Sequence, residues 1–321
     1  MRVLFHVHKW PPIHNAGAEW YCHSVARWLA DRSHDVAVVN MAATGETEFE
    51  GIPVFGGRYT TNQHERADVV ITHLDATRQA IRAARRVASK PLVHVIHNHR
   101  QLEFWNVRPD ECTLAVFNSQ WVARQAKWRG PQVVLPPPVF AADYAVSKGA
   151  PEQIVKQAIT LVNLTEAKGA PTFYALAERM ADRQFIGVVG AYGAQEPAPT
   201  LTNLQVVANS PAMRDVYAQT AVLLMPSSYE SWGRVAIEAA ASGIPTIAHP
   251  TPGLREALGR AGTFAMRDNI DKWEALLRRL EDPEHYAKVS RLSLARSLEL
   301  DPEPGLVDLE RRLAMVAAAY A

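Results

Sequence analysis

The sequence has only two cysteines and no long apolar run. Cys22 and Cys112 lie far apart and belong to no Cys-x-x-Cys pair, so the sequence predicts neither a disulfide framework nor a structural zinc site. Its apolar runs fall short of the roughly 20 residues that cross a bilayer. The run after Arg2 is also too short for the core of a signal peptide. We therefore expect a cytoplasmic protein that does not span a membrane.

The chain also lacks a large net charge, but its positive and negative residues are distributed unevenly along the 321 residues. The formal net charge is +1. Residues 1–149 carry 17 Lys and Arg against 13 Asp and Glu, which leaves 17 against 20 for the remainder. Ten of the twelve histidines also lie in the first part. The first part, at +4, is therefore the better candidate for contact with an anionic partner.

Short apolar runs alternate with longer amphipathic stretches throughout the chain. This pattern predicts an α/β protein with parallel sheets covered by helices. A proline cluster at 133–140 interrupts the alternation and indicates a hinge. We expect one doubly wound domain over 1–140, a second over 141–304, and a last helix over about 305–321 that packs back on the first domain. The expected strands start at residues 2, 35, 68, 91, 114, 158, 185, 204, 221, 244 and 262.

The stretch MPSSYESWGRVAIEAAASGIPTIAH places Glu230 just before a predicted helix and Glu238 inside it. In doubly wound sheets, ligands gather where strands end and helix N-termini point at them. Unpaired backbone amides of residues 231–233 can bind an anion there, while the two carboxylates accept hydrogen bonds from hydroxyl groups. This pattern indicates a site for a phosphate flanked by sugars.

Residues 221–256 resemble the donor-binding signature of GT-B glycosyltransferases, in particular the retaining, family 4-like enzymes of glycosyl transferases group 1. The match includes the Glu-x7-Glu core, the Pro-Ser before it and TPGLRE after it. Residues 15–39, the strand that ends at His97, and NLTEAKG at 163–169 follow in the family's order. The resemblance implies a GT-B fold, with two Rossmann-like doubly wound domains that face each other across a cleft.

The resemblance also implies roles for individual residues. Glu238 would bind the ribose of a nucleotide-diphosphate sugar, and Glu230 would hold the transferred sugar. Lys168 would neutralise the diphosphate, and His97 would orient a sugar hydroxyl near the reacting carbon. The expected catalytic residues are thus His97, Glu230 and Lys168. The expected donor-binding residues are Ala16, Gly17, Asn163, Lys168, Ser231, Trp232, Gly233, Arg234 and Glu238.

Two features bear on charge at the diphosphate. Asn163 stands where the family usually has an arginine, so a second phosphate cation is missing unless Arg234 or another residue supplies it. The sequence has no Asp-x-Asp motif of the kind that holds a divalent ion in the other main glycosyltransferase fold. We therefore expect a metal-independent enzyme without a cofactor, because fixed cations and amide dipoles can stabilise the leaving diphosphate.

Other interpretations of these motifs remain open. The pairs His6/His8 and His97/His99 have the alternation of metal ligands on a strand, but no third ligand is evident. His6, His8, His73 and His94 are more typical of buried structural histidines. Lys168 is also compatible with an ordinary lysine at a helix start.

The acceptor is expected to contact the basic first domain. Trp10 and Trp105 follow strands, where an exposed ring could stack on a sugar or a base. Arg82, Arg85 and Arg86 form a basic helix, which is either a solvated surface or a site for phosphates. A phospholipid, an anionic polysaccharide and a modified DNA base all fit, with peripheral contact to a membrane or to nucleic acid.

Two alternatives to a glycosyltransferase also fit the sequence. One is a nucleotide-sugar epimerase or sugar phosphorylase on the same scaffold, and the other is a non-catalytic polyanion-binding relative. The sequence does not identify the sugar, the base, the acceptor or the oligomeric state.

Overall fold

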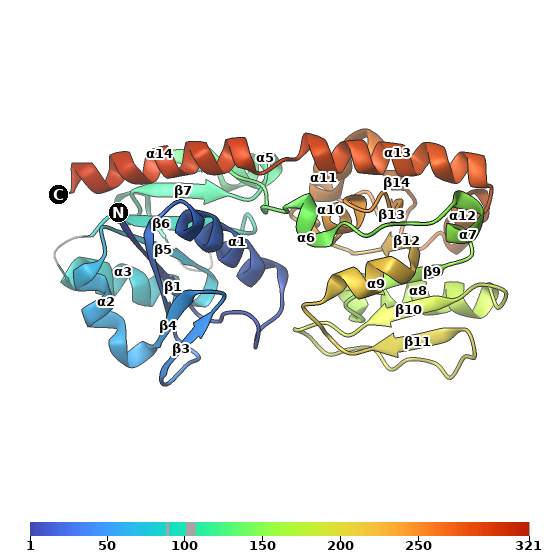
Figure 1. Cartoon of the computed structure of the whole chain (residues 1–321), viewed down its shortest axis with the longest axis horizontal. Helices are drawn as coiled ribbons and strands as arrows, with labels where there is room; N and C mark the ends of the chain where they lie inside the picture. The colour runs from blue at the N-terminus through green and yellow to red at the C-terminus, as the bar shows by residue number, and fades with distance from the viewer. Residues whose placement is uncertain (88–89, 101–106, 321) are drawn as a thin grey trace. The chain divides into compact units, whose positions relative to one another are not determined.

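The computed structural model describes residues 1–87, 90–100 and 107–320 (Figure 1). Trp105, expected at the acceptor, lies outside the described residues. The chain divides into two compact units, one of residues 1–138 with 302–321 and one of residues 139–301. Each unit is an α/β structure built around its own sheet, as the sequence predicted.

The N-terminal unit contains an eight-stranded sheet in the order β3-β4-β2-β1-β5-β6-β7-β8. Neighbouring strands are parallel except β3 and β4, which are antiparallel. The central strands are buried, as expected for a parallel sheet covered by helices. The strands are β1 (Arg2–Val7), β2 (Asp35–Asn40), β3 (Glu46–Phe49), β4 (Ile52–Gly56), β5 (Val69–His73), β6 (Leu92–Ile96), β7 (Leu114–Phe117) and β8 (Gln132–Val134).

The β3-β4 hairpin is absent from the sequence-based expectation. Its turn residues Glu50 and Gly51 have φ angles of 49° and 76°. Two successive positive φ angles match the twist of an antiparallel hairpin, and Gly at the second position adopts one without strain. The Glu-Gly pair was therefore the available sequence signal, although it is weaker than the usual Asn-Gly.

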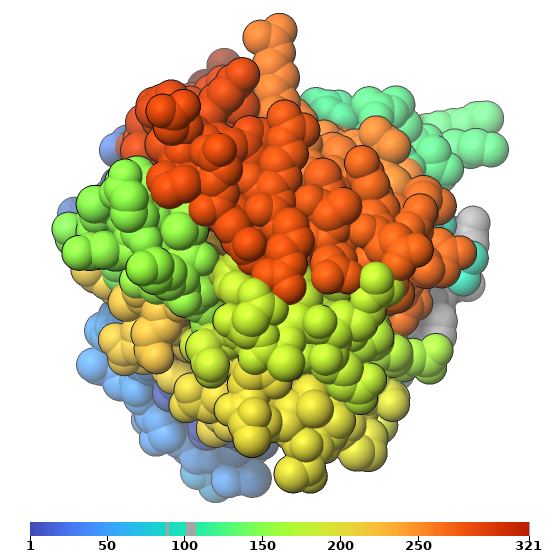
Figure 2. Space-filling view, turned by 90° about the vertical axis from the view of Figure 1, so that its right-hand side faces the viewer, coloured from blue at the N-terminus to red at the C-terminus, as the bar shows by residue number. Residues whose placement is uncertain are grey.

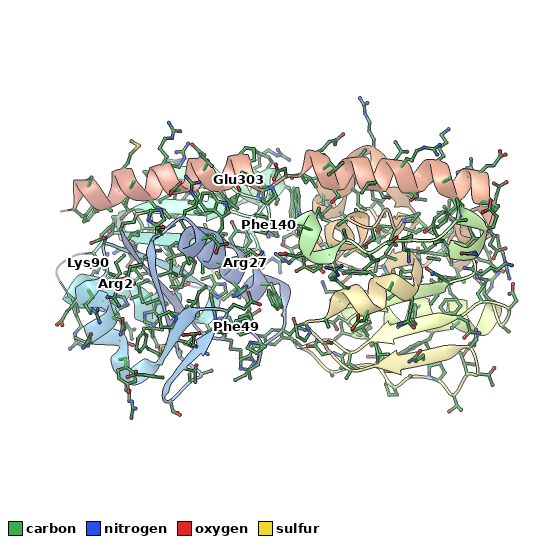
Figure 3. All side chains as sticks on the ribbon, viewed as in Figure 1. Arg2, Arg27, Phe49, Lys90, Phe140 and Glu303 are labelled. Atoms are coloured by element: carbon green, nitrogen blue, oxygen red, sulfur yellow. The ribbon has the colours of Figure 1, made fainter. Side chains whose placement is uncertain are left out.

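Helices pack on this sheet in two contacting pairs. Helix α1 contacts α14 and helix α2 contacts α3, and both pairs also contact strands. The C-terminal helix α14 thus belongs to the N-terminal unit. Trp28 Nε1 donates a hydrogen bond of 2.7 Å to Glu303, which Figure 3 labels on this helix. The helices are α1 (Gly17–Asp31), α2 (Thr60–Arg66), α3 (Thr77–Arg86), α5 (Gln120–Ala126) and α14 (Glu303–Ala319), with short 3₁₀ turns η1 (Gly57–Tyr59), η2 (Leu74–Ala76) and η3 (Pro109–Glu111).

The C-terminal unit contains a six-stranded parallel sheet in the order β11-β10-β9-β12-β13-β14. Its core includes Phe173, Phe185 and Trp273, all completely or almost completely buried. The strands are β9 (Ala158–Val162), β10 (Phe185–Val188), β11 (Leu204–Val207), β12 (Thr220–Met225), β13 (Thr246–Ala248) and β14 (Thr263–Phe264).

Helix α13 packs on α10 and on the short turn η5. Figure 2 views one face of this unit, where the orange-red segment of α13 lies beside the green segment of α7, which it contacts. The helices are α6 (Ala141–Tyr144), α7 (Pro151–Ile154), α8 (Ala170–Arg179), α9 (Met213–Gln219), α10 (Arg234–Ala240), α11 (Pro252–Leu258), α12 (Ile270–Arg279) and α13 (Pro283–Glu299), with η4 (Glu166–Lys168) and η5 (Gly259–Ala261). Within the described residues, no helix is long and apolar enough to cross a membrane.

Candidate functional site

The candidate donor site lies where the adjacent strands β9 and β12 end. One loop, residues 163–169, follows β9, and the other, residues 226–233, follows β12. The two loops are bound together, because Ser228 donates from its backbone N and its Oγ to the carbonyl of Ala167, at 2.9 and 3.2 Å. The carboxyl edge of a doubly wound sheet is the usual position of a ligand site.

Lys168 and Glu230 form an ion pair across these two loops, between Nζ and Oε1. Ser227 Oγ donates to the same carboxylate oxygen at 3.0 Å. The Lys168 side chain is one-third exposed, and that of Glu230 is 12% exposed. One cation and one carboxylate from separate motifs therefore lie together at the sheet edge, with the cation still accessible to a ligand.

Two glycines allow the loops to approach so closely. Gly169 has a φ angle of 91°, and a Cβ atom there would lie 2.4 Å from Pro226 Cγ. Gly233 has a φ angle of 105°, and a Cβ atom there would lie 2.5 Å from Leu254 Cδ2. Neither position accommodates a side chain without displacement of its neighbour. Both glycines therefore help to fix the loops that carry Lys168 and Glu230.

Glu238 is buried on α10 and both of its carboxylate oxygens have partners. Arg234 Nε donates to Oε1 at 2.7 Å, and the Tyr217 hydroxyl donates to Oε2 at 2.8 Å. Arg234 also donates to the Tyr144 hydroxyl at 2.9 Å. Burial, followed by the Glu238 charge, raises the pKa of Tyr217 well above its usual value, so that phenol is a donor at neutral pH. Each carboxylate oxygen keeps a lone pair for a ligand hydroxyl.

Ser231 and Trp232 complete the turn before α10. The Trp232 ring is buried, 3% exposed, and packs in a cluster with Val139, Ile237 and Ala257. The Trp232 ring therefore offers no stacking surface, and an amide contact from residues 231–233 stays a prediction.

Asn163 follows β9 with a φ angle of 75°, and its side chain accepts a hydrogen bond of 3.3 Å from Gln195. The compensating cation suggested from the sequence, Arg234, is instead held in the buried contacts with Glu238 and Tyr144. Arg267 is a further cation near Lys168, and no sequence motif indicated it. Its guanidinium donates to the Glu166 carbonyl, which places it on the Lys168 loop.

Ala16 and Gly17 lie in the N-terminal unit, at the start of α1. Ala16 is the N-cap residue and makes no side-chain capping hydrogen bond. A Cβ atom at Gly17 would have no other atom within 4 Å. The backbone at this helix start is therefore not covered by neighbouring side chains of the described residues.

His97 lies just after β6 in a cluster of polar side chains. His73 Nδ1 and His97 Nε2 are 3.0 Å apart, and the Tyr21 ring contacts His97 edge-on at 5.3 Å. His8 Nε2 lies 3.3 Å from Glu19 Oε1. Burial lowers the pKa of His97 to about 4, although the Glu19 carboxylate acts in the opposite direction. His97 is therefore a neutral imidazole at pH 7.

The two histidines of each alternating pair make different contacts among the described residues. His6 Nδ1 lies 2.9 Å from His64 Nε2, whereas His8 contacts Glu19. His97 contacts His73, whereas the His99 ring contacts Trp121. The structure thus gives no support to either pair as a two-residue metal site. His94, which the sequence indicated as a structural histidine, is completely buried, and its Nε2 lies 3.2 Å from Thr77 Oγ1.

The prediction that Trp10 presents an exposed ring is wrong. Trp10 is 1% exposed, and its ring packs against Phe5 and His23 with centroid separations of 6.2 and 5.6 Å. The residue follows a strand, but its ring is covered by neighbours that include His23 of α1. The position of Trp10 after a strand suggested exposure, but the sequence pattern does not show which distant side chains will pack on the ring.

The basic helix is α3. Arg82, Arg85 and Arg86 are exposed there. Arg85 lies 3.3 Å from Glu111, a carboxylate also bound by Arg78 at 3.1 Å. Arg82 and Arg86 are therefore the better candidates for contact with an anionic acceptor.

Comparison with known proteins defines the fold first. The chain superposes on Anabaena HepE in complex with UDP and glucose with a TM-score of 0.78 and 16% identity, covering 97% of this chain and 99% of that one. It superposes on sucrose-phosphate synthase from Thermosynechococcus elongatus with a TM-score of 0.78 and 15% identity, covering 99% and 100%. The chain therefore has the GT-B fold, as predicted.

Part of the C-terminal unit also resembles a known family in sequence. Residues 196–292 match the family model of glycosyl transferases group 1. A curated relative, D-inositol 3-phosphate glycosyltransferase from Gordonia bronchialis, is 37% identical over 82 residues, 25% of this chain and 18% of the relative. The match spans less than a fifth of that relative's length. The predicted resemblance to group 1 glycosyltransferases of the GT-B fold is thus confirmed.

Proposed function

We propose that this protein is a retaining glycosyltransferase that moves a sugar from a nucleotide-diphosphate sugar to a hydroxyl of an anionic acceptor. The observation that carries the proposal is the contact between Lys168 and Glu230 at the carboxyl edge of the C-terminal sheet. The group 1 match covers Glu230 and Glu238. HepE, a protein of the same fold, is described in complex with UDP-glucose, which favours a nucleotide-sugar donor here.

In the proposed reaction, the bond between the anomeric carbon and the diphosphate oxygen breaks. Negative charge develops on the diphosphate and positive charge on the sugar. A bond forms to the acceptor oxygen, and its proton passes to an oxygen of the departing diphosphate. Lys168 would stabilise the diphosphate, because a fixed cation at the leaving group lowers the barrier without reorganisation. Glu230 would bind the sugar, and the neutral His97 imidazole would orient one of its hydroxyls.

We assign Glu238 to the ribose and Arg267 to the second cation position that Asn163 leaves empty. Glu238 is oriented by Arg234 and Tyr217, so its remaining lone pairs have a fixed direction. Arg267 is held on the Lys168 loop by the Glu166 carbonyl. The Lys168 and Arg267 cations, together with backbone amides of residues 231–233, would then make a divalent ion unnecessary.

Calorimetry with UDP-, GDP- and ADP-sugars tests the donor assignment. We expect one nucleotide class to bind and Glu238→Gln to weaken it by about 1–3 kcal/mol, the usual cost of a lost hydrogen bond to a charged group. Arg267→Gln should weaken the same donor. Glu152→Gln, a change at an exposed carboxylate of the same unit, is the control. Unchanged affinity in a folded Glu238→Gln variant would contradict the assignment.

A further inference from the structure

Three side chains of metal-ligand type come together in the N-terminal unit although they are far apart in sequence. Cys22 lies on α1, His73 ends β5 and His97 follows β6. One potential ligand atom from each side chain lies within 4.8 Å of the other two. Cys22 and His73 are completely buried. The fold thus places a thiol and two imidazoles around one point.

The spacing of this group is close to that of a tetrahedral metal site. With Zn–N bonds of about 2.0 Å and a Zn–S bond of about 2.3 Å, ligand atoms lie roughly 3.3–3.5 Å apart. His73 Nδ1 and His97 Nε2 are 3.0 Å apart. A shift on the order of 1 Å, within the reach of side-chain rotation, would bring the thiol to the same spacing.

His8 is a further donor beside this group. Its ring centroid lies 5.2 Å from that of His73. Its Nε2 is paired with Glu19, while its Nδ1 is buried and has no hydrogen-bond partner among the described residues. Histidines that bind a metal through one ring nitrogen commonly donate the other N–H to a carboxylate, which fixes the orientation of the ring.

We propose that Cys22, His73 and His97 form a binding site for a thiophilic divalent metal such as Zn²⁺, with His8 or solvent at the fourth position. Thiolate and imidazole ligands favour Zn²⁺ and Co²⁺ over Mg²⁺ and Ca²⁺. The Cys22 thiol would release its proton to solvent as the sulfur–metal bond forms. A bound metal would also engage His97, so binding would oppose the sugar-orienting role proposed above, and only this consequence rests on the proposed function.

Cobalt spectroscopy tests the site without any sugar substrate. Metal-free protein is titrated with Co²⁺, and we expect one equivalent to produce visible bands of tetrahedral intensity together with a near-ultraviolet thiolate-to-cobalt band. The Cys112→Ser variant should keep the visible and the near-ultraviolet bands. Cys22 is the sole thiol of that variant, so its thiolate band would identify Cys22 as the sulfur ligand. Zn²⁺ should displace Co²⁺ and abolish the bands.

Ligand variants complete the test. In Cys22→Ser the thiolate band should vanish, and in His73→Asn the Co²⁺ affinity should fall at least about tenfold. His285→Asn, in the C-terminal unit, should leave both unchanged. The absence of the thiolate band in folded Cys112→Ser would overturn the proposal even if the Cys22 and His73 variants failed to fold. Persistence of that band in folded Cys22→Ser would overturn it as well.

Discussion

Lys168 and Glu230 are 62 residues apart in sequence and form an ion pair at the edge of the C-terminal sheet. Lys168 lies in the loop after β9, and Glu230 lies in the loop after β12. The Ser228–Ala167 hydrogen bonds hold these two loops together. In the proposed reaction, Lys168 exchanges part of its contact with Glu230 for the donor diphosphate. Glu230 is then released toward the sugar hydroxyls.

Gly169→Ala should disrupt this loop pair. The added methyl group would clash with Pro226, and the positive φ angle of Gly169 is unfavourable for alanine. We expect the variant to lose donor binding in calorimetry and to unfold at lower temperature. Gly149→Ala is the control, because its Cβ would contact just the flexible end of the Gln153 side chain. Equal donor affinity in the two variants would argue against a fixed loop geometry.

Acid should destabilise the N-terminal unit. Burial lowers the pKa of His6 and His94 to about 3 and that of His64 and His97 to about 4, and it lowers the pKa of His73 well below 6.5. Between these values and 6.5 the unfolded chain binds more protons than the folded one. Stability is therefore complete above pH 6.5 and falls as the pH is lowered through the range toward 4.

Each such histidine contributes a slope of up to about 1.4 kcal/mol per pH unit. Tryptophan fluorescence during denaturation at pH 7.5 and 5.5 measures the effect, because six of the eight tryptophans lie in the first 149 residues. We expect a lower midpoint at pH 5.5. Equal midpoints at both values would show that these imidazoles are protonated in the folded state.

Turnover should not require a divalent metal. Lys168, Arg267 and backbone amides are proposed to stabilise the diphosphate, so full activity should survive EDTA. EDTA should also remove any ion from the Cys22, His73 and His97 site, so the rate should stay the same or increase. A strict requirement for Mg²⁺ or Mn²⁺ in single-turnover measurements would refute the metal-independent mechanism.

Charge reversal on α3 should weaken the acceptor alone. Arg82→Glu with Arg86→Glu should raise the acceptor KM and reduce its salt dependence, because attraction between exposed charges is screened by salt. Donor affinity should not change. Arg85 is left in place because it is paired with Glu111. Arg291→Glu, an exposed reversal in the C-terminal unit, is the control. Efficient transfer to a neutral sugar, indifferent to salt, would identify α3 as a solvated surface.

Local patterns in the sequence predicted much of the fold. The alternation of apolar runs and amphipathic stretches predicted the two Rossmann-like sheets. Each buried parallel strand is a short apolar run, which can be recognised from the local sequence alone. The β3-β4 hairpin was missed because Glu46–Phe49 is an exposed edge strand with a polar sequence. An edge strand of this kind has no apolar period to detect.

Residues of the candidate site could be proposed from the sequence where one continuous motif carries them, but not where distant segments meet. Glu230 and Glu238 share a continuous signature. The Tyr217 contact with Glu238, the Arg267 contact with Glu166 and the burial of Trp10 all depend on long-range packing. The proximity of Cys22 to His73 and His97 likewise arises from the order of the strands in the sheet. No local spacing encodes these contacts.

The rate of nucleoside diphosphate release by Lys168→Gln, with the best donor and an acceptor present, tests the central claim most directly. The variant retains a hydrogen-bonding side chain but loses the cation, so we predict that kcat falls about 100-fold or more, the usual effect of removing one such stabilising group. Lys156→Gln, at an exposed lysine of the same unit, should keep the wild-type rate. Wild-type release by folded Lys168→Gln would contradict a donor diphosphate site at the loops that carry Lys168 and Glu230.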